Sequence, residues 1–451
     1  MHRSHPPLLA LAALLSLGTA ACSNFSHKEP PPPPVILHTA TMDLTPGISV
    51  NLVKTPPGFT PIAGQPPLWL QGGKELALAG TIQGRTEVLG FGGSAYKNVR
   101  LVAADGGPGA PHGKIVALAA SPGGLTLAVA EATPGRIEVV LRYVISNAGQ
   151  NSVATFDGNF HAVSLTWVAQ DTIAVSLAGE RGSSAADVGG LYLVHVLGAV
   201  SVEQVKFACP PSPLSFSPDM RFAVGEGDER TPVSLFDSRA ARCRMVLPVG
   251  PVRVLGWAPG NNAFLYSTPG VNGRGAGVFR YTIGSGGTDL IAVSSSAAAY
   301  TGSGIIMALG ARELDPRTAA AEPNKRVTAR IASFLPARVQ SSTAANGAAI
   351  APSETLIDDL GIPTTPAMLL ASTMDYSHGF AELAMQMYAD EPGGPTRKIV
   401  TFSIVDRKAF VLASGTARGV AVIGWAPNAN RLVVFDGDGA TGGVAVITPQ
   451  R

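Results

Sequence analysis

The sequence predicts an all-β fold, and two observations carry this prediction: a recurring turn unit and a turn-rich composition. Residues 256–266 read Gly-Trp-Ala-Pro-Gly-Asn-Asn-Ala-Phe-Leu-Tyr, and related segments occur at 216–224 and 424–434. In each, an aromatic residue ends one apolar run, a Pro-containing turn with Gly, Asn or Asp follows, and a second apolar run begins. Pro presets φ for the turn and the small polar residues tolerate the dihedrals that come next, so the unit predicts a tight β-hairpin. The 52 Gly and 36 Pro residues among 451 favour many such turns between short strands.

The turn unit repeats at a regular distance along the chain. Its clear copies begin at Trp69, Ala120, Trp167, Phe216 and Trp257, with spacings of 51, 47, 49 and 41 residues, and a last clear copy begins at Trp425. A period of this length is typical of a four-stranded β-propeller blade. We therefore predict a single propeller over residues 35–451. Its repeated aromatic residues are expected to pack as core between the blades: Trp69, Trp167, Phe216, Trp257 and Trp425.

The number of blades stays open between seven and eight. Weak copies of the unit begin at Tyr300 and near Pro366, and the 168 residues from Trp257 to Trp425 exceed three regular spacings. Residues 311–365 are rich in Ala, Pro and Ser, which predicts a longer loop excursion at one mouth of the ring, with a short helix around 354–360. We also expect a strand within residues 35–53 to pair with residues 443–448, because this pairing closes the ring and removes two exposed sheet edges.

The amino terminus carries an export signal. Residues 1–21 combine Arg3, an apolar run and the small residues before Cys22, which is the pattern of a secretory signal and too short for a membrane span. The ending resembles the lipobox of bacterial lipoproteins, in which Cys22 would be lipidated and become the mature amino terminus. The lipobox has Leu three residues before the Cys, where this chain has Thr19, so ordinary cleavage after Ala21 is the alternative.

A proline-rich tether follows Cys22 and spans residues 22–34. Its five consecutive prolines, at 30–34, favour an extended polyproline helix of about 3 Å per residue. A lipid anchor and such a tether would hold a folded domain close to a membrane surface; the alternative is a ligand for a proline-recognising module. Ser23 after the Cys resembles the outer-membrane sorting signal of Gram-negative lipoproteins, so we expect an anchored envelope protein that faces the periplasm in such a cell.

The two remaining cysteines, Cys209 and Cys243, fall at similar positions in consecutive repeats. In an oxidising compartment they are a candidate disulfide, and two independent buried thiols are the alternative.

Charge and histidine content exclude several function classes. The 33 basic and 31 acidic residues nearly balance and form no long run of one sign, so we expect no nucleic-acid partner. The histidines are scattered without metal-ligand spacing and no catalytic motif is present, so we expect no metal, no cofactor and no enzyme activity. The densest charged group in the repeats comprises Arg221, Asp228, Glu229 and Arg230, which is either a solvated loop or an interaction site.

The repeated turn, an aromatic residue followed by Ser or Ala, Pro, and Asp, Gly or Asn, resembles the repeat of TolB-like and other WD-like bacterial β-propellers. The resemblance covers residues 60–451, although the usual Asp-Gly pair is replaced here by Gly-Gly, Asp-Met or Gly-Asn. It implies a lipid-anchored envelope propeller that acts as a non-enzymatic protein-binding or scaffold module. The alternative is a propeller enzyme or small-ligand binder that uses the central channel. A purely structural envelope protein is a third hypothesis. The identity of the partner or ligand stays open.

Overall fold

The structure is a computed structural model of the full chain. It describes residues 37–38, 42–44, 49–62, 65, 67–105, 113–144, 151–179, 189–205, 214–227, 232–240, 242–270, 275–312, 314, 316–336, 349–377, 379, 381–416, 423–426, 431–436 and 443–448. Residues 1–21 and 22–34, expected to form the signal and the tether, lie outside this set. None of the helices in the described segments is both long and apolar enough to span a membrane.

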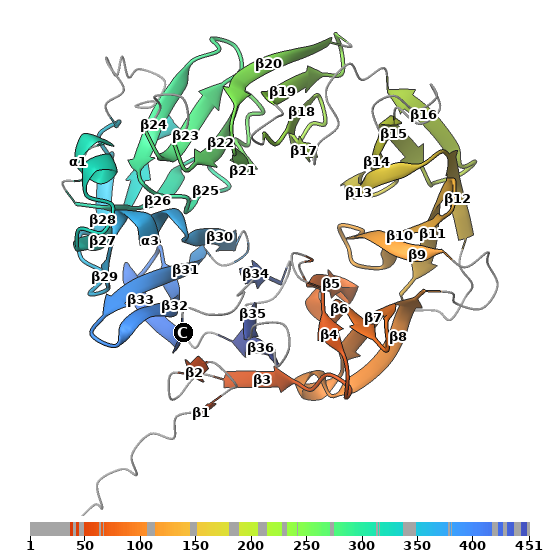
Figure 1. Ribbon diagram of the computed structural model, residues 1–451, viewed down its shortest axis with the longest axis horizontal. Coiled ribbons are helices and arrows are strands. Elements are labelled where there is room, and N and C mark those ends of the chain that lie inside the picture. The colour runs from red at the N-terminus through yellow and green to blue at the C-terminus, as the bar shows by residue number, and fades with distance from the viewer. Residues whose placement is uncertain are drawn as a thin grey trace, which may run out of the picture. The chain divides into compact units, whose positions relative to one another are not determined.

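The described residues of the unit Ile36–Arg451 form a propeller of eight antiparallel sheets, one for each blade (Figure 1). The predicted all-β propeller is therefore confirmed, and the blade number is eight rather than seven. Within each blade the strands follow one another as a meander, and Figure 1 shows the first strand at the centre of the ring and the fourth at its rim. The opposite ends of a blade are thus formed by different sets of turns, because neighbouring strands run in opposite directions.

The first four blades come in chain order. Blade 1 contains β4 (Thr60–Pro61), β5 (Leu68–Leu70), β6 (Glu75–Ile82), β7 (Arg85–Gly92) and β8 (Asn98–Ala104), with the short 3₁₀ turns η1 (Gln71–Gly73) and η2 (Ser94–Tyr96). Blade 2 contains β9 (Lys114–Ala120), β10 (Thr126–Thr133), β11 (Arg136–Tyr143) and β12 (Asn151–Asp157). Blade 3 contains β13 (Phe160–Ala169), β14 (Thr172–Gly179), β15 (Gly189–His195) and β16 (Ser201–Val205). Blade 4 contains β17 (Leu214–Phe216), β18 (Phe222–Gly225), β19 (Pro232–Asp237) and β20 (Arg242–Val249).

The last four blades include the two short helices and the amino-terminal strands. Blade 5 contains β21 (Arg253–Trp257), β22 (Ala263–Thr268), β23 (Gly277–Thr282) and β24 (Thr288–Val293). Blade 6 contains β25 (Ala298–Tyr300), β26 (Ile306–Ala311), β27 (Val327–Phe334), β28 (Glu354–Ile357) and β29 (Pro363–Thr364), with α1 (Pro316–Ala321) between β26 and β27. After α3 (Pro366–Leu370), blade 7 contains β30 (Thr373–Ser377), β31 (Glu382–Glu391), β32 (Gly394–Ser403) and β33 (Lys408–Thr416), to which β1 (Leu37–His38) and β2 (Met42–Leu44) add. Blade 8 contains β34 (Ile423–Trp425), β35 (Leu432–Asp436), β36 (Gly443–Thr448) and, as its fourth strand, β3 (Ser49–Val53).

The inner strands of the blades are covered on both faces, which explains their nearly continuous apolar sequence. In β14, seven consecutive residues from Thr172 to Ala178 are buried. A strand exposed on one face would alternate apolar and polar residues, whereas a strand packed between two neighbouring sheets has no solvent face. The core therefore consists of apolar layers between successive blades.

The predicted closure of the ring is confirmed. β3 pairs antiparallel with β36 in the register Ser49 to Thr448 and Val53 to Val444, so the amino-terminal strand completes the last blade. The preceding hairpin behaves differently: β1 pairs with β2, and β2 pairs with β33 at the rim of blade 7. The amino-terminal segment thus joins two adjacent blades.

Two expectations about the weak repeats are wrong. Residues 354–357 form the strand β28, not a helix, because they pair with β27 as the fourth strand of blade 6. The unit near Pro366 is not a hairpin turn either, since Pro366–Leu370 forms the helix α3, capped by Thr365. The equivalent hairpin of blade 7 joins β30 to β31, with Ser377 paired to Glu382. The expected excursion at 311–365 therefore contains regular strands of blade 6; residues 337–348 within it lie outside the described set.

The turns between the first and second strands share one backbone hydrogen bond in five of the blades. In each of these turns, the residue after the repeated aromatic position donates its backbone N–H to a carbonyl across the turn. The pairs are Ser121 to Thr126, Ser217 to Phe222, Ala258 to Ala263, Thr301 to Ile305 and Ala426 to Arg431. The residue with positive φ in these turns is Gly124, Met220, Asn261 or Gly304. These turns and the turns between third and fourth strands lie at the same end of the blades, which we call the turn face of the ring.

The repeated aromatic residues lie at the ends of the innermost strands. Trp69, Trp167 and Trp257 are partly buried and pack against the apolar layers between blades, and Trp425 is 9% exposed. The indole Nε1 of Trp167 donates to the Ala119 carbonyl in the preceding blade at 3.0 Å, and Trp257 makes the equivalent bond at 3.1 Å to Ser215 Oγ. Phe216 holds the same repeat position in blade 4 and is half-buried. The aromatic position thus connects the inner strands of neighbouring blades.

Candidate functional site

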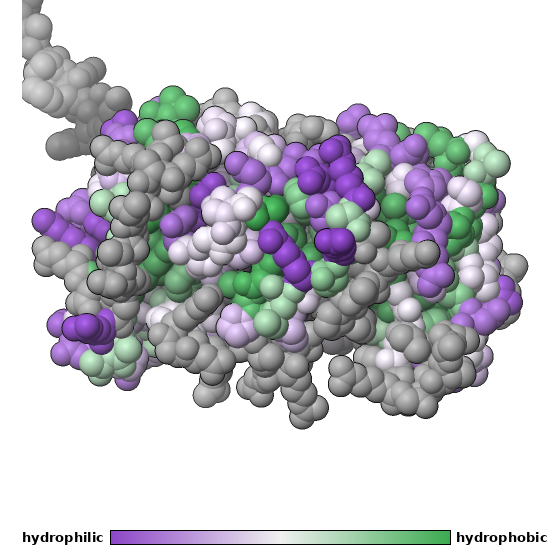
Figure 2. All heavy atoms as spheres, turned by 90° about the horizontal axis from the view of Figure 1, so that it is seen from above, coloured by the Kyte–Doolittle hydropathy of each residue, from purple (hydrophilic) through white to green (hydrophobic). Residues whose placement is uncertain are grey.

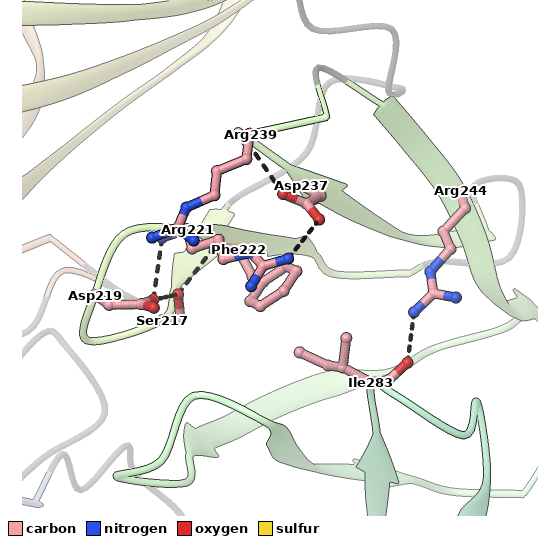
Figure 3. Close-up of polar contacts among 8 residues, drawn as sticks. All are labelled: Ser217, Asp219, Arg221, Phe222, Asp237, Arg239, Arg244 and Ile283. Carbon is pink, nitrogen blue, oxygen red and sulfur yellow. Dashed lines mark hydrogen bonds and ion pairs between the residues drawn. The ribbon is translucent and has the colours of Figure 1, made fainter.

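Blade 4 carries a group of four arginines at the turn face and rim, which we call the blade 4 arginine cluster: Arg221, Arg239, Arg242 and Arg244. Arg221 comes from the turn before β18, Arg239 from the turn between β19 and β20, and the other two from β20. Both turns lie at the same end of the blade. The meander therefore brings Arg221 close to Arg239, which is 18 positions away in the sequence. Figure 3 shows Arg221 and Arg239 around Asp237, with Arg244 directed toward the neighbouring blade.

Arg221 is held in place by three contacts. Its Nη2 lies 3.3 Å from Asp237 Oδ2, and its guanidinium carbon lies 4.6 Å from the centre of the Phe222 ring (Figure 3). Its backbone N–H donates to Asp219 Oδ1 at 3.1 Å. The other oxygen of Asp237 accepts the backbone N–H of Arg239 at 3.1 Å. One carboxylate therefore fixes both turns of the blade.

Asp219 acts within the turn rather than as a free acid. Its Oδ1 accepts the Ser217 hydroxyl at 2.7 Å, and Ser217 Oγ accepts the Phe222 N–H. Partial burial alone would raise the pKa of Asp219, but hydrogen bonds from Ser217 and Arg221 and the charge of Arg221 hold it below its ordinary value. The carboxylate is therefore ionised at neutral pH and already engaged.

The rest of the cluster faces solvent. Arg239 and Arg242 are exposed, and neither forms an ion pair with any described residue. Arg244 donates from Nη2 to the Ile283 carbonyl of blade 5 at 2.8 Å and so spans two blades. Beside it on β20, Met245 is 67% exposed. Figure 2 views the ring from the side where Figure 1 places β20 and β24, and strongly hydrophilic residues lie there next to hydrophobic ones.

Of the four residues of the predicted interaction site, Arg221 is the one within the described residues. Arg221 precedes β18, whereas Glu226 and Gly227 follow its end at the opposite end of the blade. Asp228, Glu229 and Arg230 lie outside the described residues, so their grouping with Arg221 stays a prediction. The described neighbours of Arg221 are Asp237, which ends β19, and Arg239, in the turn between β19 and β20. Both are distant from Arg221 in the sequence.

The other predicted site residues are placed as follows. Cys22 and Cys209 lie outside the described residues, and Cys243 in β20 is disulfide-bonded. The pairing of Cys243 with Cys209 stays a prediction. Within the described segments, no three His, Cys, Asp or Glu side chains lie close enough together to hold a metal ion. His195 bonds Thr172 Oγ1 through Nδ1 at 3.1 Å, across two paired strands.

A cavity of about 580 Å³ lies against the first strands of blades 2 and 3 and extends to blade 1. Its lining is mainly apolar, with Val116, Leu118 and Phe160 from the inner strands. Of the described lining residues, Lys114 is the one that carries a charge. The uncharged polar side chains of Gln65, Thr81 and Thr86 also line this cavity.

Comparison with known proteins reveals similarity in fold. No protein-family model matches the chain, and no curated protein matches it in sequence. Among solved structures, TolB from Acinetobacter baumannii has a TM-score of 0.31 at 13% identity, covering 74% of this chain and 77% of that one. Chaetomium thermophilum Sqt1, bound to the N-terminus of the ribosomal protein L10, has a TM-score of 0.46 at 11% identity, covering 84% and 94%. A prolyl endopeptidase has a TM-score of 0.45 at 11% identity, covering 84% of this chain but only 54% of its own. At these identities the likeness concerns the propeller architecture alone.

Proposed function

We propose that this protein is a lipid-anchored β-propeller of the bacterial cell envelope that binds a partner protein, without enzymatic activity, through the blade 4 arginine cluster. The observation that carries the proposal is the exposure of Arg239 and Arg242 without an acidic partner among the described residues. They stand beside two arginines that are held in fixed positions by Asp237 and by the Ile283 carbonyl.

The chemistry of this cluster suits an acidic protein segment. Guanidinium groups are weakly hydrated and pair with carboxylates through two parallel hydrogen bonds, so they are enriched at protein interfaces. Arg221 and Arg244 are pre-positioned by the fold, which lowers the entropy that binding must remove. Met245, on the other face of the same rim strand, adds an exposed apolar side chain. A partner with an acidic stretch and a flanking apolar residue fits these groups.

The anchored location is supported by the sequence. Cys22 follows a secretory signal with a lipobox-like ending, and residues 22–34 give the proline-rich spacer. Such a tether would let the propeller search a layer near the membrane, with the outer membrane and periplasm as the compartment in a Gram-negative cell. The tether raises the local concentration of the propeller relative to other envelope proteins.

A second candidate function is binding of a small ligand in the ring. The cavity of about 580 Å³ beside the inner strands has a size that small-molecule sites typically have. Its apolar lining favours an apolar ligand over a substrate for polar catalysis. The partner-binding proposal is preferred because the arginine cluster offers several oriented charges, whereas this cavity offers one.

The test is an affinity capture from detergent-solubilised membranes with four forms of the protein. These are wild type, Cys22→Ser, the double variant Arg239→Glu/Arg242→Glu, and the control Arg136→Glu, which changes an exposed arginine on the opposite face. We expect a defined partner with wild type and Arg136→Glu, loss of it with the double variant, and loss of membrane association with Cys22→Ser. Recovery of the same partner by the double variant would refute the arginine site, and unchanged membrane association of Cys22→Ser would refute the anchor.

A further inference from the structure

A second polar site lies where the ring closes, at the junction of blade 8 with blade 1. A cavity of about 460 Å³ opens there at the turn face; we call it the seam pocket. Its polar lining residues are Gln71, Lys74, Glu75, Asn98, Arg100 and Arg431. Three of them are cationic and one is acidic, which makes this cavity more highly charged than the apolar cavity beside blades 2 and 3.

The acidic residue of the pocket is fully engaged by its neighbours. Glu75 is 3% exposed and receives Arg100 Nε at 2.7 Å, Arg100 Nη2 at 2.8 Å and Gln71 Nε2 at 2.8 Å. Its carboxylate lies against Gly90, where an added Cβ would come within 2.1 Å of Oε1. A buried carboxylate with a bidentate arginine partner offers little repulsion to an incoming anion. Glu75 therefore positions Arg100 without cancelling the remaining cations.

Arg431 reaches the pocket from blade 8. Its Nη1 donates to the Tyr96 hydroxyl at 2.8 Å and to the Gly73 carbonyl at 3.4 Å, and its guanidinium carbon lies 5.7 Å from the centre of the Tyr96 ring. These contacts fix the plane of the guanidinium group. Its Nε and Nη2 have no acceptor among the described residues. These two nitrogens lie on the same side of the guanidinium group, so both can donate to one ligand.

Lys74 and Asn98 complete the set of donors. Lys74 is exposed in the turn before β6, and its ammonium group has no acidic partner among the residues of the described set. The Asn98 amide lies over Gly93, where an added Cβ would come within 2.4 Å of Nδ2. The pocket thus presents an oriented guanidinium, an ammonium and an amide to one space.

We propose that the seam pocket binds a small anionic ligand through its carboxylate or phosphate group. The two free donors of Arg431 match two oxygens of either group, and Lys74 adds a compact positive charge. The volume of about 460 Å³ lies within the range of small-molecule sites, so the anionic group can carry an attached moiety. This site is separate from the blade 4 arginine cluster and its occupancy does not depend on a protein partner.

The ligand would also bridge the last blade and the first blade of the ring. Arg431 belongs to the last blade, and Lys74, Asn98 and Arg100 belong to the first. An anion held by both blades adds a contact across the junction, and a ligand that binds only the folded state raises its stability by mass action. Binding is therefore expected to raise the melting temperature in step with ligand concentration.

The experiment is a titration of the purified propeller with inorganic phosphate and, separately, with succinate at low ionic strength, followed by calorimetry and by thermal unfolding. The variants are Lys74→Met, Arg431→Gln and Arg431→Lys, with Lys97→Met as the control because Lys97 is exposed nearby but does not line the pocket. We expect Lys74→Met and Arg431→Gln each to weaken binding about ten-fold, because hydrogen bonds to charged groups are the stronger ones. Arg431→Lys should retain part of the affinity, and Lys97→Met should match wild type.

Comparison of the two anions shows which anionic group the pocket prefers. Tighter binding of phosphate identifies a phosphate-bearing ligand, and tighter binding of succinate identifies a carboxylate. The proposal is overturned if neither anion binds wild type more tightly than it binds Lys74→Met, or if Lys97→Met loses as much affinity. The Lys74 side chain is exposed and forms no hydrogen bond or ion pair with the described residues, so this comparison stands even if Arg431→Gln does not fold.

Discussion

Trp257 and Ser215 belong to neighbouring blades, and the indole Nε1 of Trp257 donates to Ser215 Oγ at 3.1 Å. Trp167 donates in the same way to the Ala119 carbonyl at 3.0 Å. In both cases the acceptor residue immediately precedes the aromatic position of the preceding repeat. Trp167 and Trp257 thus each form a polar connection between blades in addition to their apolar packing.

Replacement of Trp257 by Phe should destabilise the protein by about 1–2 kcal/mol, because it removes this hydrogen bond and part of the packing. Ser215→Ala should cost less, and the double variant should cost less than the sum of the two. Urea unfolding of the four proteins gives the coupling, expected at about 0.5–1.5 kcal/mol. Trp425→Phe is the matched comparison, since its buried Nε1 has no partner among the described residues. An equal loss for both tryptophans would contradict the role of the bond.

Gly124 should not tolerate a side chain. Its φ is +65°, and an added Cβ would lie 2.8 Å from the Gln71 nitrogen, the Leu70 Cα and the Trp69 carbonyl oxygen of the adjacent blade. Its own carbonyl accepts the Gln71 N–H at 2.8 Å. Gly124→Ala is expected to cost about 3 kcal/mol through left-handed strain and overpacking. Gly135→Ala, at φ +77° with open space around it, should cost about 1 kcal/mol in the same thermal melts.

Met220 occupies a position in the blade 4 turn that favours Gly or Asn. Its φ is +57°, and the equivalent residues in other blades are Gly124, Asn261 and Gly304. Met220→Asn should stabilise the protein by about 0.5–1 kcal/mol, because Asn tolerates the left-handed region. Chemical denaturation measures the change. A destabilised variant would indicate that packing of the half-buried Met220 side chain outweighs the backbone strain.

Loss of the closing strand should open the ring. A protein that begins at residue 37 retains β3 and is expected to melt like the full chain. A protein that begins at residue 54 lacks the ladder between Ser49–Val53 and β36, and leaves a bare edge on blade 8, so it should melt at a clearly lower temperature and aggregate more readily. Thermal unfolding with light scattering compares the two. Equal melting temperatures would refute the closure.

Glu226 should make stability decline as pH rises. Burial raises the pKa of its carboxyl, although a hydrogen bond from the Val254 N–H and the charge of Arg253 oppose this. The folded state then binds the proton more tightly than the unfolded state, so its stabilising contribution is complete below the ordinary pKa of 4.5 and is lost as pH rises through the higher folded value. Glu226→Gln should remove this decline and raise the melting temperature at pH 7. A parallel pH profile for the two proteins would refute this assignment.

The repeat of aromatic, Pro and small polar residues predicted the fold because each element of the pattern acts locally. Pro, Gly and Asn set the turn, and Trp257 ends an inner strand, whatever the rest of the chain does. The two weak units escaped prediction for the opposite reason. In blade 6, residues 354–357 become a strand only by pairing with β27, and near Pro366 the chain forms a capped helix instead of a turn.

The candidate sites depend on contacts that a linear pattern does not contain. Arg221 meets Asp237 because the meander returns the chain to the same end of blade 4. One feature of the repeat sequences does indicate the seam pocket. At the position that closes the inner turn, blades 4 and 5 have Phe222 and Ala263, whereas the two blades flanking the junction have the charged Glu75 and Arg431.

If the proposed anchor holds the protein by its amino terminus, the arrangement of β1, β2 and β3 has a mechanical consequence. A pull from that end loads the hairpin β1–β2 first, and this hairpin has strands of only two and three residues. The five-residue ladder of β3 with β36 lies behind it in the chain. Under such a load, tension would be released by separation of the hairpin from blade 7 while the closed ring stays intact.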